Sequence, residues 1–163
     1  MIKLYFIFFI SISLTCSCQI SSNSATVETN FHNADFKIFY TENTPSEYTK
    51  PFEDPWDNST LNVDTVNVIC DHNDLKNIHV KYNDLGQTAL VLELNEAGTT
   101  KLSEATKKSI GKKLAIISKE RIIIAPYVKE EIPEGLIQVS GHYTFEELEK
   151  LKGEIINNNQ TAK

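Results

Sequence analysis

Apolar and polar residues alternate in several short stretches of the chain, which is the pattern of half-buried β-strands. In residues 35–41, for example, Phe36, Ile38 and Tyr40 share one face. Residues 60–69 fit either a strand or a short helix capped by Asn62. Residues 42–58 contain three prolines and are predicted to form a surface loop, with a short extended piece inside it as an alternative. Strands are predicted at residues 35–41, 78–82, 89–94 (a central strand), 113–118, 121–126 and 136–140.

Two segments have the spacing of amphipathic helices. The first follows Asn95, whose side chain suits an N-cap, and it is expected to end with Gly111 at the C′ position. The second begins at the capping box formed by Thr144 and Glu147. The residues expected to face inward are Leu102, Ala105, Ser109 and Ile110 in the first helix, and Phe145, Leu148, Leu151 and Ile155 in the second. Strands on both sides of two helices predict an α+β fold with a mixed or antiparallel sheet.

The first residues carry the pattern of an export signal. A basic residue precedes the run 4–14, which is apolar except for two serines. That run is too short to span a hydrocarbon core of about 30 Å, but it suits the core of a signal peptide. Small residues and Cys18 follow, as in bacterial lipoprotein signals, and Cys18 is the predicted lipidation site. Lipidation of Cys16 and an ordinary secretory signal cleaved near residues 24–25 are the alternatives.

Composition sets the remaining boundaries. Residues 1–17 are the predicted lipoprotein signal peptide, and residues 18–34 are rich in Ser, Asn and Thr, which predicts a flexible tether. An edge strand within the tether is the alternative. Residues 35–156 form the predicted domain and residues 157–163 a polar tail. Acyl chains on Cys18 would hold the domain at the inner or outer membrane of the cell envelope, facing the periplasm or the cell surface.

Charge and cysteine content narrow the function classes. Without residues 1–17 the chain has 15 basic and 22 acidic residues, a net charge of −7. This acidic balance argues against a general nucleic-acid binder. Once Cys18 is lipidated, Cys70 is the one thiol left, so the domain must be held together by its core rather than by a disulfide.

The sequence contains no convincing catalytic, cofactor or metal motif. Residues 106–113 superficially resemble a phosphate loop but lack its first glycine and its final Ser or Thr. His142 beside Glu146 and Glu147 is better explained by a turn and a helix cap than by acid–base catalysis. One cluster offers zinc-competent side chains without a zinc-site spacing: Cys70, Asp71, His72, Asp74 and His79. We therefore expect no enzyme activity, no cofactor and no metal.

Surface side chains suggest where a partner would bind. Trp56 is either a lid on the core or a binding anchor, and Trp56, Tyr127 and Tyr143 are the predicted partner contacts. Strand addition at an exposed edge near residues 121–126 is one predicted mode. A basic cluster is either a solvated helix face or a surface for anionic headgroups or an acidic client: Lys107, Lys108, Lys112 and Lys113.

An ordered set of short motifs runs through residues 89–151. They are LVLELNE at 90–96, Gly98 to Leu102, Thr106, Gly111-Lys112, Leu114-Ala115-Ile116, Ala125-Pro126, Ile132, Gly135, Val139-Ser140-Gly141 and Tyr143-Thr144. Together they resemble the head subdomain of the first periplasmic domain of SecD and SecDF, membrane subunits that assist bacterial protein export. The segment before Ala89 resembles that head only in layout.

The resemblance implies an α+β head subdomain outside the cytoplasmic membrane, without catalytic residues, that is proposed in the family to contact the translocating polypeptide. Beyond its signal segment, the chain is expected to lack both transmembrane helices and the base subdomain of the family. The sequence thus predicts an envelope lipoprotein with a polypeptide- or protein-binding domain, for which a role in protein export is one option. The alternatives are an accessory lipoprotein that docks on an envelope complex, and a small-ligand or metal-binding module, or a cryptic enzyme, that uses either His72 and His79 together or His142.

Overall fold

The computed structural model describes residues 31, 34–83, 85–140 and 143–156. The predicted signal peptide, Cys18 and the polar tail lie outside the described residues, as does nearly all of the tether. The elements of the described part are β1 (Lys37–Glu42), β2 (Thr49–Glu53), β3 (Thr60–Asp71), the 3-10 helix η1 (His72–Asp74), β4 (Leu75–Tyr82), β5 (Thr88–Leu94), α1 (Glu96–Lys108), β6 (Leu114–Ser118), β7 (Arg121–Ile124), β8 (Leu136–Ser140) and α2 (Phe145–Ile156).

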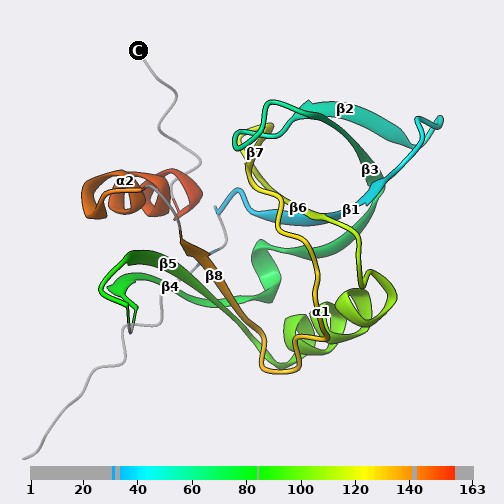
Figure 1. Ribbon diagram of the computed structural model, residues 1–163. Coiled ribbons are helices and arrows are strands. Elements are labelled where there is room, and N and C mark those ends of the chain that lie inside the picture. Colours follow the sequence, from blue (N-terminus) through cyan, green and yellow to red (C-terminus); the bar gives the residue numbers. More distant parts are fainter. Residues whose placement is uncertain (1–30, 32–33, 84, 141–142, 157–163) are drawn as a thin grey trace, which may run out of the picture.

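The strands form two antiparallel sheets, with the orders β2-β3-β1-β6-β7 and β4-β5-β8. Figure 1 shows the five-stranded sheet curling round so that its two edge strands, β2 and β7, face each other. Among the described residues no ladder of hydrogen bonds joins these two strands, and we call this opening the β2–β7 seam. Helix α2 packs on β4 and β5, and α1 packs against β3 and β5. The expected α+β fold is confirmed.

Strand β6 has all five residues buried because both of its faces are covered. Leu114 and Ile116 face the main core between the sheets and the helices. Ala115 and Ile117 face a smaller core enclosed by the curled sheet. The alternation follows from the two-residue period of a strand, and it explains why β6 is apolar from Leu114 to Ile117.

Helix α1 begins where its cap predicts. The side-chain oxygen of Asn95 accepts the Gly98 N–H at 3.0 Å, which satisfies one of the free amides of the first turn. Leu102 and Ala105 are buried in the main core, as expected from their spacing.

The end of α1 differs from the prediction. Ser109, not Ile110, is the C-cap, and Ile110 lies beyond the helix with 58% of its surface exposed. Gly111 is therefore one position past C′, although its φ of +83° is the left-handed conformation that favours glycine. Its N–H donates to the Val128 carbonyl at 2.8 Å. The helix stops early because this tertiary hydrogen bond directs the chain into β6.

Helix α2 has its predicted capping box. The Thr144 N–H donates to the Glu147 carboxylate at 2.8 Å, and the Glu147 N–H donates to the Thr144 hydroxyl at 3.2 Å. Leu148, Leu151 and Ile155 are buried as expected. The inward prediction for Phe145 is wrong: the ring is 39% exposed and stacks on Tyr82 with the ring centroids 5.8 Å apart. In the first turn of α2, Phe145 therefore contacts the end of β4 instead of the core.

Two strands correct the predicted boundaries. Strand β2 is the short extended piece that was the alternative within the loop predicted at residues 42–58, and Pro51 is tolerated there because β2 is an edge strand. Residues 60–69 adopt the strand alternative rather than the helix capped by Asn62, and β3 continues to Asp71. Irregular register between β1 and β3 blurs the alternation from which strands are predicted.

Gly135 provides a test of the packing between α1 and the start of β8. Its φ is +67°, and a Cβ there would lie 2.0 Å from the Thr99 hydroxyl oxygen. Gly111 has a φ of +83° but no atom within 4 Å of such a Cβ. We expect Gly135→Ala to lower the free energy of unfolding by about 3 kcal/mol, and Gly111→Ala by about 1 kcal/mol, because only the first adds a clash. Urea unfolding measures both, and equal losses would contradict the contact.

Candidate functional site

An apolar cleft of about 240 Å³ opens on the described part of the domain. It lies between α1, β6, β8 and the connection from β7 to β8. Its deep walls are core side chains, among them Leu102 and Ile116, which are almost fully buried. Tyr127 stands at its edge with 64% of its surface exposed. The lining residues are Ile38, Leu102, Thr106, Leu114, Ile116, Pro126, Tyr127, Val128, Lys129, Glu130, Ile132 and Ile137.

Hydrogen bonds fix the β7–β8 connection that forms one lip of the apolar cleft. The Val128 N–H donates to the Lys112 carbonyl at 2.9 Å, opposite the bond from Gly111. Further on, the buried Thr106 hydroxyl accepts the Ile132 N–H at 3.0 Å and donates to the Leu102 carbonyl at 2.8 Å. Because both ends of the lip are held by the end of α1, the cleft is a built feature of the fold.

Lys113 joins the cleft to the turn that carries Trp56. Its ammonium group donates to Asp54 at 2.7 Å and to Asp57 at 3.3 Å, and it lies 5.2 Å from the centre of the Tyr127 ring. The side chain of Asp54 is only 1% exposed and that of Lys113 11%. The hydrogen bond to Asp54 is the largest cause of a raised pKa for Lys113. Asp54 also accepts the Trp56 main-chain N–H at 3.0 Å, so the same carboxylate shapes the turn.

Trp56 and Tyr143 come together although 87 positions separate them in the sequence. Their rings meet edge to face with centroids 5.8 Å apart. The Tyr143 hydroxyl donates to the Ile123 carbonyl in β7 at 3.5 Å, and burial raises the pKa of this tyrosine. Trp56 is 43% exposed, so it covers Tyr143 without being buried itself. A second hollow of about 170 Å³ adjoins them, between β7 and α2.

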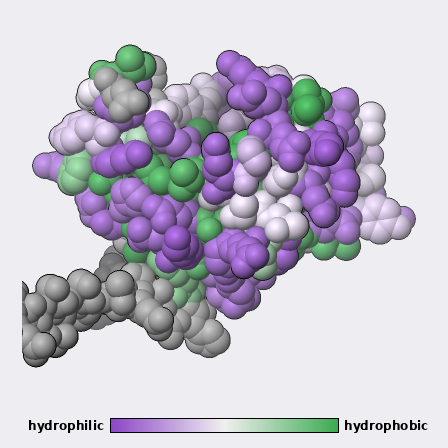
Figure 2. Space-filling view, turned by 90° about the horizontal axis from the view of Figure 1, so that it is seen from below, coloured by the Kyte–Doolittle hydropathy of each residue, from purple (hydrophilic) through white to green (hydrophobic). Residues whose placement is uncertain are grey.

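The three predicted partner contacts therefore occupy two places. Tyr127 lies at the apolar cleft, whereas Trp56 and Tyr143 lie at the edge of β7. Whether they contact a partner stays a prediction. Sequence reasoning missed the rest of the cleft, and the apolar residues Val128 and Ile132 in an otherwise polar connection were the available signal. Figure 2, which views the molecule from below, shows a mostly hydrophilic surface with hydrophobic residues in small patches.

The basic cluster is not one positive surface. Lys113 is occupied by its two aspartates, Lys112 lies 3.8 Å from Glu42, and Lys108 lies 3.8 Å from Glu104. Carboxylates thus offset three of the four lysines, which favours the solvated helix face over a surface for anionic headgroups.

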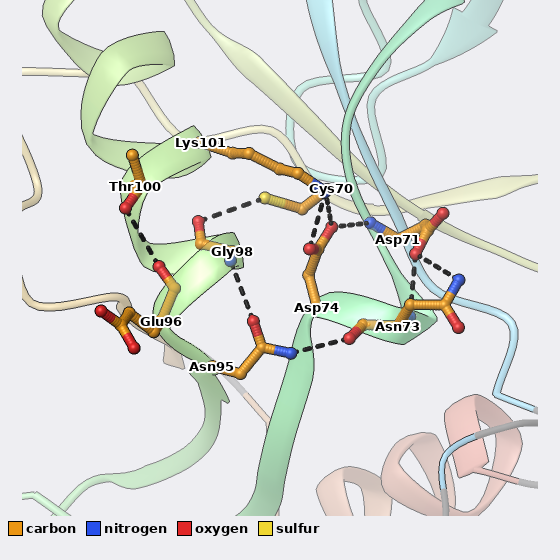
Figure 3. Close-up of polar contacts among 9 residues, drawn as sticks. All are labelled: Cys70, Asp71, Asn73, Asp74, Asn95, Glu96, Gly98, Thr100 and Lys101. Carbon is orange, nitrogen blue, oxygen red and sulfur yellow. Dashed lines mark hydrogen bonds and ion pairs between the residues drawn. The ribbon is translucent and has the colours of Figure 1, made fainter.

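The polar residues around Cys70 form a structural clamp between η1 and α1 (Figure 3). The Cys70 thiol donates to the Gly98 carbonyl at 3.6 Å. Asp74 binds the Lys101 ammonium group at 2.7 Å, and its other oxygen accepts the Asp71 N–H at 3.0 Å. Asn95, the cap of α1, donates to the Asn73 carbonyl at 2.7 Å. Burial raises the pKa of Cys70 to about 12, so its thiol is protonated at neutral pH.

Other candidate residues can now be placed. Among the residues that the structure describes, no three His, Cys, Asp or Glu side chains are grouped to hold a metal ion. His79 lies on β4 with its Nδ1 atom 3.8 Å from the Glu93 carboxylate. Glu147 caps α2, and the Thr144 hydrogen bonds hold the pKa of its carboxyl below the ordinary value. His142 and Cys18 lie outside the described residues.

The family model described as "SecDF, P1 head subdomain" matches residues 46–155. The chain belongs to this family. The match begins well before Ala89, so the upstream strands share more than a layout with the family. It includes β2 and β3 and ends within α2, and the apolar cleft lies almost wholly inside it.

The individual relatives that the chain resembles are also SecD proteins. The chain is 34% identical over 83 residues to the protein translocase subunit SecD of Sebaldella termitidis, which is 51% of this chain and 20% of that protein. It is also 34% identical over 77 residues to SecD of Dictyoglomus turgidum, covering 47% of this chain and 19% of the relative. The chain thus spans about a fifth of the length of these curated relatives.

Solved structures show the same fold. A chain described as "Structure and function of a membrane component SecDF that enhances protein export" matches with a TM-score of 0.54 at 20% identity, covering 76% of this chain and 60% of that chain. SecDF in its super-membrane-facing form matches with a TM-score of 0.54 and covers 71% of this chain and 18% of that one. In the part of this chain that the structure describes, no helix has the length and apolar character needed to cross a membrane.

The Lys113 cluster gives a stability prediction with an adjacent control. Lys113→Met leaves the Asp54 carboxylate buried without its cation, and we expect it to lower the free energy of unfolding by about 3 kcal/mol. Lys112→Met removes an exposed pair with Glu42 and should cost less than about 1 kcal/mol. Chemical denaturation at neutral pH compares the two variants. Similar small losses in both would show that the Asp54–Lys113 pair does not hold the turn.

Cys70 gives a pH prediction. Its ordinary pKa of 9.0 is raised in the folded chain to about 12, so above pH 9 the unfolded chain releases a proton that the folded chain keeps. Stability must therefore fall as the pH rises through this window. Between pH 9 and pH 11, wild type should lose about 2 kcal/mol more unfolding free energy than Cys70→Ala. Parallel alkaline losses in the two proteins would contradict the burial of the thiol.

Proposed function

We propose that the chain is a lipid-anchored protein of the bacterial envelope whose head domain binds an extended polypeptide without catalysing a reaction, in support of protein export. The observation that carries the proposal is the apolar cleft, which opens beside Tyr127 in a member of the SecDF P1 head family.

The size and lining of the cleft suit an apolar side chain. An engineered protein cavity of about 150 Å³ holds benzene, so about 240 Å³ accommodates a leucine or phenylalanine side chain. The walls are apolar, and the charged residues of the lining are Lys129 and Glu130, which offset each other on the lip. A pocket of this kind favours an uncharged apolar group, which unfolded polypeptides expose and folded ones bury.

The names of the relatives support a role in export. The matched proteins are called protein translocase subunits, and one matched structure is described as a membrane component, SecDF, that enhances protein export. The same comparisons support a place outside the cytoplasmic membrane and a binding role rather than an enzymatic one. The proposal extends a binding role to this chain, but not the activity of the whole translocase subunit, because the chain spans only a small part of the length of those proteins.

The lipid anchor at Cys18 is proposed from the sequence alone. An apolar run followed by Cys18 fits a lipoprotein signal, and several acyl chains bind a membrane stably because each buried CH₂ contributes about 0.8 kcal/mol. The residues that follow would then tether the head at the membrane surface, within reach of a chain emerging from it.

Site-specific photo-crosslinking in cells tests the binding role. A photoreactive phenylalanine analogue replaces Tyr127 at the cleft or, as a matched control, Tyr82 at the end of β4; these tyrosines are 64% and 63% exposed. We expect adducts with many polypeptides at Tyr127 and few at Tyr82. Equal labelling at both positions would contradict a polypeptide site at the cleft.

Two further observations complete that experiment. One stoichiometric adduct that also copurifies in mild detergent would replace the proposal with docking on a fixed envelope complex. Cells carrying Cys18→Ala should lose the protein from the membrane fraction and, with it, the Tyr127 adducts. Retention of both in this variant would contradict the lipid anchor.

A further inference from the structure

Strand β7 has an outer edge that the fold leaves without a partner strand. It is the last strand of the five-stranded sheet, and across the β2–β7 seam it approaches β2 without a ladder of hydrogen bonds in the described part of the chain. Edge strands of this kind are templates for another extended chain unless they are protected.

The turn before β7 determines which of its main-chain groups point outward. Lys119 and Glu120 have φ angles of +49° and +57°, which are those of a two-residue hairpin turn. The pair that flanks such a turn, Ser118 and Arg121, is hydrogen-bonded across the strands. The next pair, Ile117 and Ile122, is then not hydrogen-bonded, so the N–H and C=O of Ile122 point away from β6.

A β-bulge exposes one more acceptor. The register moves from Ile117 opposite Ile122 to Ile116 opposite Ile124, which leaves Ile123 as the extra residue. Its carbonyl accepts the Tyr143 hydroxyl at 3.5 Å, a distance at the limit of a hydrogen bond. Tyr143 thus occupies, weakly, a position that the N–H of an added strand would occupy.

The Trp56 and Tyr143 rings, which form a cap over this edge, cover it only in part. Trp56 packs on Tyr143 from a turn that is fixed at Asp54, and it is 43% exposed. The second hollow of about 170 Å³, which Tyr143 and Pro55 help to line, has apolar walls of Ile122, Ile123 and Leu151.

The charges around the second hollow select its occupant. Its rim has two basic and two acidic side chains: Arg121, Lys150, Glu147 and Glu154. Arg121 is paired with Glu154 across the gap between β7 and α2. A rim without net charge, beside outward-facing N–H and C=O groups, fits an uncharged extended polypeptide rather than an anion, a cation or a lipid headgroup.

We propose that the outer edge of β7 is a strand-addition site for an extended, uncharged polypeptide segment, which displaces the Tyr143 hydroxyl and the Trp56 ring and widens the β2–β7 seam where the two strands approach. The inference rests on the proposed function, because the occupant is a polypeptide. It adds a second mode of recognition: β7 would hydrogen-bond the main chain of the polypeptide, while the apolar cleft would bind one of its apolar side chains.

The test uses the full chain in detergent and a synthetic peptide. The probe is a fluorescein-labelled nonapeptide of alternating valine and threonine, and the control probe has the same side chains with every second main-chain nitrogen methylated. Trp56 is the one tryptophan of the chain, so its fluorescence reports on this site, while peptide anisotropy reports binding anywhere. We expect saturable binding that changes Trp56 emission, and at least about tenfold weaker binding of the methylated peptide.

Variants separate the cap from the rest of the surface. Tyr143→Phe keeps the ring but frees the Ile123 carbonyl, so the peptide should bind about threefold tighter. The control Tyr48→Phe removes the hydroxyl of an exposed tyrosine next to the start of β2 and should leave the affinity unchanged. Equal affinity of the methylated peptide, or binding that leaves Trp56 emission and the Tyr143→Phe affinity unchanged, would overturn strand addition while the cleft proposal stands. Absence of any peptide binding, together with absence of Tyr127 adducts in cells, would overturn both.

Discussion

The burial of β6 on both faces is the constraint on which the rest of the domain depends. One face of this strand closes the main core and the other closes the small core inside the curled sheet. A flat sheet would leave the second face in water, so the sheet must curl until β2 and β7 approach each other. Leu114 and Ile116 also form the floor of the apolar cleft, and Lys113, just before the strand, holds the Trp56 turn. Core, cleft and seam are therefore consequences of one doubly buried strand.

Local signals in the sequence predicted the elements whose causes are local. Asn95 and Thr144 start helices because a cap needs only the next few residues, and the β6–β7 hairpin follows from two apolar runs around a short polar turn. The features that local signals left open or predicted wrongly depend on distant partners. Strand β2 exists because β3 pairs with it, and Ile110 is exposed because Val128 draws the chain away from the helix.

The candidate site was predictable only in some of its aromatic residues. Trp56 and Tyr143 stand out in composition, but nothing near either one in the sequence indicates that they meet. Asp54 and Lys113, which connect the Trp56 turn to the end of β6, are 59 positions apart. The apolar cleft gathers side chains from β1, α1, β6 and the β7–β8 connection, and most of them are ordinary core residues in their own segments. Only the packing of these segments leaves a space between them.

Hydrogen–deuterium exchange of the full chain in detergent tests most directly the claim that this head domain binds polypeptides at the cleft. The measurement compares the chain alone with the chain plus a permanently unfolded polypeptide, reduced and carboxymethylated lactalbumin. The account predicts slower exchange in residues 126–132, which form the lip, and unchanged exchange in the β4–β5 turn. Unchanged exchange in the lip at saturating polypeptide, or equal slowing in the turn, would contradict it.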